Sequence, residues 1–118
     1  MELSMELSVT SNDVDLGSSE YELLSRRCRK LERVLSRHNP SSTHLRVFVR
    51  RIARTWFLEA TGALSLHGRV LVARAKGETP LAVLSEMTEE LLRQAHDHIA
   101  QEKRGLKSGR GLHQAAVV

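Results

Sequence analysis

Apolar residues recur at two different periods along this chain, and the change of period limits the fold more than any other feature. Residues 20–37 and residues 80–104 carry apolar side chains at every third or fourth position, the spacing that lines one face of a helix. In the first stretch these are Tyr21, Leu24, Cys28, Leu31 and Leu35, and in the second they are Leu81, Leu84, Met87, Leu91, Ala95 and Ile99. We therefore expect two amphipathic helices, each of which buries its apolar stripe.

Shorter stretches alternate apolar and polar residues, which is the period of a strand with one buried face. Four strands are expected, over residues 5–9, 43–51, 56–66 and 69–76. His67-Gly68 lies between the last two and suits a tight hairpin, because glycine tolerates a positive φ. The order β-α-β-β-β-α predicts an α+β domain in which both helices cover one face of a four-stranded sheet.

The other face of this sheet is then open to solvent. Alternation along the strands predicts that four side chains point there, namely Arg46, Phe48, Arg50 and Arg74. Trp56 and Phe57 are neighbours at the expected start of the third strand, so they should face opposite sides, with one of them in the core.

The length of 118 residues suits one domain, which we place at residues 5–104, between an extended start (1–4) and a flexible tail (105–118). The single cysteine, Cys28, excludes an internal disulfide and fits a core position in the first helix. No stretch approaches the roughly 20 apolar residues of a membrane span, and the start lacks a secretory or transit pattern. A cytoplasmic protein is therefore expected. The scarcity of aromatic residues, 3% of the chain, argues against a reader of single-stranded nucleic acid.

The net charge of +4 conceals a strong separation of charge along the sequence. Residues 21–54 carry ten basic and two acidic side chains, whereas residues 1–20 carry five acidic side chains and no basic one. Residues 78–102, which include most of the second helix, carry six acidic side chains against the single basic residue Arg93. The basic segment over residues 21–54 permits an anionic partner.

The first helix carries most of that basic charge. Its basic side chains are Arg26, Arg27, Arg29, Lys30, Arg33 and Arg37. Within this set Arg26, Lys30, Arg33 and Arg37 recur three or four residues apart and form neighbouring rows on the helix surface. Such a stripe can follow phosphates, whose neutralisation releases counterions and gives sequence-independent affinity. A solvated helix face is the plainer alternative.

Other chemistry finds little support in the sequence. His96 and His98 are two residues apart, which places them on different sides of a helix, whereas helical metal ligands favour a spacing of four. No group of residues supplies a nucleophile, a base and an oxyanion donor together. We therefore expect neither an enzyme nor a bound metal or cofactor, and no small-molecule substrate.

Several motifs together resemble one known family. They are Met5-Glu6-Leu7-Ser8-Val9-Thr10, then Asn12-x-Val14-x-Leu16, Lys30-Leu31-Glu32-Arg33, the hairpin Leu64–Ala73 and the run from Gly77 through Leu84 to Leu91-Leu92-Arg93-Gln94. In this order, over about residues 5–104, the chain resembles the ribosome hibernation-promoting factors, also called ribosome-associated inhibitor A or sigma-54 modulation proteins. Each motif alone is weak, but their shared order is fairly specific.

The resemblance implies a fold similar to double-stranded RNA-binding domains, which binds rRNA of the small ribosomal subunit in the channel used by mRNA and tRNA. Such a factor inhibits translation by steric occupancy, and a short-type member without a second domain is a monomer off the ribosome. Basic RNA-contacting positions of the family match Arg27, Lys30 and Arg33. With the residues chosen above, the predicted RNA contacts are Arg26, Arg27, Lys30, Arg33, Arg37, Arg50, Arg74 and Arg93.

The second helix departs from the family pattern. Family members are usually basic in its latter half, whereas this chain has Glu89, Glu90, Asp97 and Glu102 around Arg93. Carboxylates facing phosphate are repulsive, which weakens RNA affinity through this helix. A divergent member that acts as a regulatory protein-interaction module, through its acidic second helix, is therefore the alternative function.

Overall fold

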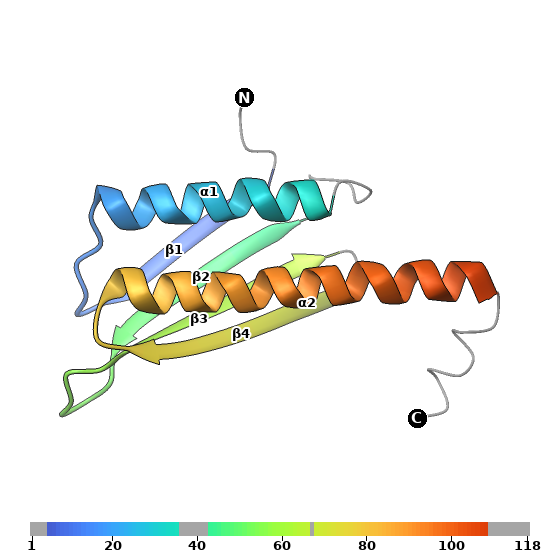
Figure 1. Cartoon of the computed structure of the whole chain (residues 1–118). Coiled ribbons are helices and arrows are strands. Elements are labelled where there is room, and N and C mark those ends of the chain that lie inside the picture. The colour runs from blue at the N-terminus through green and yellow to red at the C-terminus, as the bar shows by residue number, and fades with distance from the viewer. Residues whose placement is uncertain (1–4, 36–42, 67, 109–118) are drawn as a thin grey trace.

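Six elements follow one another in the order that the apolar periods predict. The computed structural model describes residues 5–35, 43–66 and 68–108. Its elements are β1 (Glu6–Asn12), α1 (Ser18–Val34), β2 (His44–Arg51), β3 (Leu58–Leu66), β4 (Arg69–Gly77) and α2 (Pro80–Ser108). Both helices lie on one face of the sheet, so the predicted α+β fold is confirmed (Figure 1).

The four strands stand in the sheet in chain order, β1-β2-β3-β4. β1 and β2 are parallel because α1 crosses over between them and returns the chain to its starting end. β2, β3 and β4 are antiparallel neighbours, and Gly68 in the tight connection from β3 to β4 has a φ of +79°. α1 therefore lies over β1 and β2, and α2 lies over β3 and β4 (Figure 1).

The core between the helices and the sheet is aliphatic. Leu24 and Leu31 of α1, Leu84 and Leu91 of α2, and Leu45 of β2 are fully buried there. Close packing at its centre requires a glycine on β3: a Cβ at Gly62 would overlap the side chains of Met87 and Leu91. The two helices are thus fixed on the sheet by tight contacts of apolar side chains.

Two predicted core residues are exposed. Tyr21 is 47% exposed and Leu23 is buried instead, because Leu23 lies one turn before Arg27, on the side of α1 that contacts α2. Leu81 is 42% exposed, whereas Val83 is buried against Gly77 at the end of β4. In each helix the neighbouring element shifts the buried stripe sideways from the position that a single helix predicts.

The ends of three elements also differ from the prediction. α1 begins at Ser18, two residues before the expected start at residue 20, and the Glu20 carboxylate accepts the Gly17 N–H at 2.7 Å. β3 begins at Leu58, so Trp56 and Phe57 precede it and neither is buried, contrary to the expectation that one would enter the core. α2 extends past Arg104 to Ser108, and residues 109–118 of the expected tail lie outside the described residues.

Candidate nucleic-acid interface

The solvent side of α1 carries four exposed cations, Arg26, Arg29, Lys30 and Arg33, which we call the basic face of α1. Because Leu24, Cys28 and Leu31 fix the opposite side in the core, these four side chains must point outward. Among the residues that the structure describes, none of the four takes part in an ion pair. Arg29 was not among the predicted RNA contacts. It lies three residues after Arg26 and four before Arg33, and this helical spacing could have placed it on the same face.

One acidic residue of α1, Glu32, is engaged at the start of β1. The carboxylate of Glu32 accepts the backbone N–H of Met5 at 2.7 Å and is thereby directed to the start of β1.

Cys28 lies on the buried side of α1, in the core, where burial and then the nearby Glu32 raise the pKa of its thiol to about 11. The thiol is therefore protonated at neutral pH, in agreement with the predicted core role.

Arg27 lies on a different side of α1, against α2. Its Nη2 donates to Ser85 Oγ at 3.0 Å and lies 3.5 Å from Glu89 Oε2, and its side chain is only 16% exposed. The guanidinium thus joins the two helices. An RNA contact by Arg27 stays a prediction, and it would compete with this interhelical contact.

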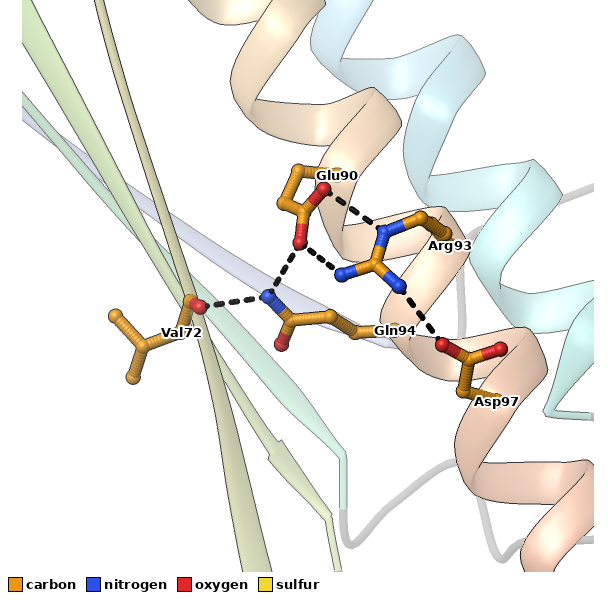
Figure 2. A network of polar contacts seen from close by, with 5 residues as sticks. All are labelled: Val72, Glu90, Arg93, Gln94 and Asp97. Atoms are coloured by element: carbon orange, nitrogen blue, oxygen red, sulfur yellow. Dashed lines mark hydrogen bonds and ion pairs between the residues drawn. The ribbon is translucent and has the colours of Figure 1, made fainter.

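Arg93 on α2 is held by two carboxylates of its own helix (Figure 2). Its Nε donates to Glu90 at 3.0 Å and its Nη1 donates to Asp97 at 2.8 Å. Hydrogen bonds from Arg93 and then from Gln94 lower the pKa of Glu90 to about 2. Gln94 Nε2 also donates to the carbonyl of Val72 on β4 at 2.9 Å. The positive charge of Arg93 is therefore already paired, within an otherwise acidic helix surface.

The open face of the sheet presents the side chains that the alternation predicts. Arg46, Phe48, Arg50 and Arg74 are all exposed there. Strand register places Phe48, Thr61 and Arg74 in one row across the sheet. Arg50 lies opposite Glu59 in the next row and pairs with it at 2.8 Å. This face is basic, but the helix layer separates it from the basic face of α1.

The eight predicted contacts are consequently divided among several surfaces. Only Arg26, Lys30 and Arg33 share one exposed face, while Arg50 and Arg74 lie on the far side of the sheet. Arg37 lies outside the described residues. Within the described part of the chain, no group of three metal-ligating side chains comes together, and no helix is long and apolar enough to cross a membrane.

Comparison with solved structures finds this fold in other proteins. The N-terminal domain of protein Y from Thermus thermophilus matches 80% of this chain and 99% of its own length, with a TM-score of 0.64 and 10% identity. A ribosomal subunit interface protein from Coxiella burnetii matches 81% of this chain and 99% of its own length, with a TM-score of 0.56 and 17% identity. No protein-family model and no curated protein sequence matches this chain. At these identities the likeness establishes the fold.

Proposed function

We propose that this protein associates with the ribosome, contacts rRNA of the small subunit and inhibits translation by occupying the channel of mRNA and tRNA. The observation that carries the proposal is the basic face of α1, four cations without an acidic partner among the described residues. It lies on a fold that is shared with a ribosomal subunit interface protein. The resemblance of the sequence to hibernation factors points in the same direction.

The chemistry of the basic face suits a phosphate backbone. Residues three and four apart on a helix are neighbours, with their Cβ atoms about 5–6 Å apart, so the four cations form one continuous patch. Arginine donates in a planar fork that matches phosphate oxygens. Contacts of this kind recognise the shape of folded RNA and do not read its bases. Steric inhibition needs no catalytic residue.

Co-sedimentation with purified 30S and 70S particles at about 50 mM salt tests the proposal, because phosphate contacts are strongest at low salt. We expect the wild type to co-sediment and the Lys30→Glu plus Arg33→Glu variant to remain in the supernatant. Arg46→Glu plus Arg74→Glu reverses the same number of charges on the open sheet face and serves as the matched control.

Failure of the wild type to co-sediment at this salt concentration contradicts ribosome association. Loss of binding in the sheet-face variant alone would instead place the RNA contact on Arg46 and Arg74. The second result would distinguish the two basic surfaces of the molecule.

A second candidate is a regulatory protein-interaction module, favoured by the acidic solvent side of α2. An open hollow of about 610 Å³ lies between this helix and β4, and its charged lining residues are three glutamates and two arginines, Glu86, Glu89, Glu90, Arg74 and Arg93. Such a surface suits a basic protein segment. A pull-down that recovers one non-ribosomal protein without rRNA, and loses it in Glu86→Lys plus Asp97→Lys, would favour this function.

A further inference from the structure

All four aromatic side chains of the protein lie at the surface. Tyr21 is 47%, Phe48 is 49%, Trp56 is 84% and Phe57 is 46% exposed, whereas the core is built from aliphatic residues. Aromatic rings bury more apolar area than other side chains when they enter a core. Their exposure here contributes little to folding and is typical of a contact surface.

Two of the four rings, Trp56 and Phe57, lie at one end of the sheet, whereas Phe48 lies in the middle of β2. Past the last ladder pair, Ile52 N–H donates to the carbonyl of Phe57 at 2.9 Å and continues the β2–β3 hairpin. Because side chains alternate along a strand, Phe57 shares the open sheet face with Glu59 and, further along, with the row that contains Phe48. Trp56 lies beside Phe57 in the connection between the strands.

The connection itself is ordered by hydrogen bonds. Thr55 Oγ1 donates to the Ile52 carbonyl at 2.8 Å and accepts the Phe57 N–H at 3.1 Å. Arg54, between Ile52 and Thr55 in the sequence, has a φ of +65°, in the left-handed region that favours glycine. A strained arginine on a well-bonded turn is a common property of functional loops, because folding alone favours glycine there.

The charge around these rings is positive. Arg51 and Arg54 are exposed, and within the described residues neither forms an ion pair. Arg74 adds a third unpaired cation in the row of Phe48. Rings that offer a free face, next to cations that attract phosphate, are the combination by which proteins bind unpaired nucleotides.

We propose that this region, the aromatic end of the sheet (Arg54, Trp56 and Phe57), binds single-stranded RNA. An unpaired base stacks on Trp56, while Arg54 contacts the adjoining phosphate. This site goes beyond the proposed function, because the basic face of α1 contacts only the backbone of folded RNA. It requires an accessible base, which a duplex does not offer.

Trp56 is the only tryptophan of the chain, so its fluorescence reports directly on this site. We expect a short single-stranded oligoribonucleotide to quench it, and an abasic oligomer of equal length or an RNA duplex to quench it far less. By anisotropy of a labelled oligonucleotide, Trp56→Ala should weaken binding about 5- to 150-fold, the range that stacking of one base contributes. Trp56→Phe should retain most of the affinity, and Tyr21→Ala, an exposed ring elsewhere, should leave it unchanged.

Three outcomes would overturn this inference. The first is that the abasic oligomer binds as tightly as the intact one. The second is that anionic lipid vesicles shift the Trp56 emission while RNA does not. The third is that the emission shifts with protein concentration alone, as the chain self-associates. Circular dichroism of Trp56→Ala verifies that the variant is folded.

The test is separable from that of ribosome binding. Lys30→Glu plus Arg33→Glu should abolish co-sedimentation and leave base-dependent quenching of Trp56 in place. If the wild type quenches with RNA but never binds ribosomes, the proposed function is wrong and the single-strand site stands.

Discussion

The two helices lie side by side on the same face of the sheet, yet they differ sharply in the surface that they present to solvent (Figure 1). Inward, each contributes fully buried leucines, Leu24 and Leu31 from α1 and Leu84 and Leu91 from α2. Outward, α1 presents four cations without acidic partners among the described residues, whereas Arg93 of α2 is paired with Glu90 and Asp97. Packing thus makes the inner halves equivalent and leaves the outer halves free to differ in function.

The largest expected effect concerns the buried sides of the two helices, which pack in the same core. Leu24→Ala and Leu91→Ala should each lower the free energy of unfolding by about 2–5 kcal/mol, because each leaves a cavity in the same core. Leu81→Ala, at an exposed position of α2, should change it by less than about 0.5 kcal/mol. Urea denaturation followed by circular dichroism measures all three. A small loss for only one of the buried leucines would mean that the helices are not equally fixed to the sheet.

A smaller effect separates two adjacent arginines of α1. Arg27→Ala should cost about 1 kcal/mol of stability, because it removes the hydrogen bond to Ser85 and the ion pair with Glu89. Arg26→Ala should leave stability unchanged and instead reduce the salt dependence of RNA binding by about 0.7–0.9 log units per log unit of salt, one phosphate contact. Denaturation and a salt titration of RNA affinity measure the pair. A loss of stability in Arg26→Ala, together with a reduced salt dependence of RNA binding in Arg27→Ala, would contradict the assignment of Arg27 to the helix interface.

The acidic surface of α2 can be altered without disturbing that interface. Glu86→Gln plus Asp97→Asn removes two negative charges and keeps Glu89 for Arg27. We expect RNA affinity to rise by up to about fivefold at low salt, since exposed charges contribute at most about 1 kcal/mol, and the gain should vanish at high salt. A binding titration of labelled RNA at both salt concentrations measures it. Unchanged affinity at low salt would show that bound RNA does not approach α2.

The smallest effect is a pH dependence that only α2 should show. The pKa of Glu90 is lowered from 4.5 to about 2, so its pairing with Arg93 stabilises the fold above pH 4.5 and is lost as the pH falls towards 2. The difference in Tm between the wild type and Glu90→Gln should therefore shrink across this range. Glu86→Gln, which removes one exposed carboxylate of the same helix outside this pairing, serves as the control for the loss of a negative charge. A constant difference for Glu90→Gln down to pH 2 would contradict the pairing.

Much of the fold could be predicted from local patterns. Alternation placed β2 and the open face correctly, including Phe48 and Arg74, because burial on one side of a sheet follows directly from a period of two. Positions at the sides of a helix were not predictable in this way. Tyr21 and Leu81 fit the stripe of an isolated helix, and the burial of Leu23 and Val83 in their place depends on the neighbouring elements.

The candidate site was less predictable than the fold. The pairing of Arg93 with Glu90 and Asp97 was visible in principle, since these residues are three and four positions apart on one helix. The contact of Arg27 with Ser85 and Glu89 spans two helices and required the tertiary structure. The small number of aromatic residues argued against a single-strand reader, but composition does not reveal that all four rings are exposed or that Trp56 and Phe57 adjoin at one end of the sheet.

The hydrogen bond from Gln94 to the carbonyl of Val72 also has a consequence for assembly (Figure 2). β4 is the last strand of the sheet, and the unpaired backbone of such an edge strand is a template on which another chain can add a strand. Gln94 occupies one of these acceptors, and the same amide is anchored by Glu90 at 3.0 Å. α2 therefore does more than cover the core, because it also occupies a backbone acceptor of β4 with which a strand of another chain would otherwise pair.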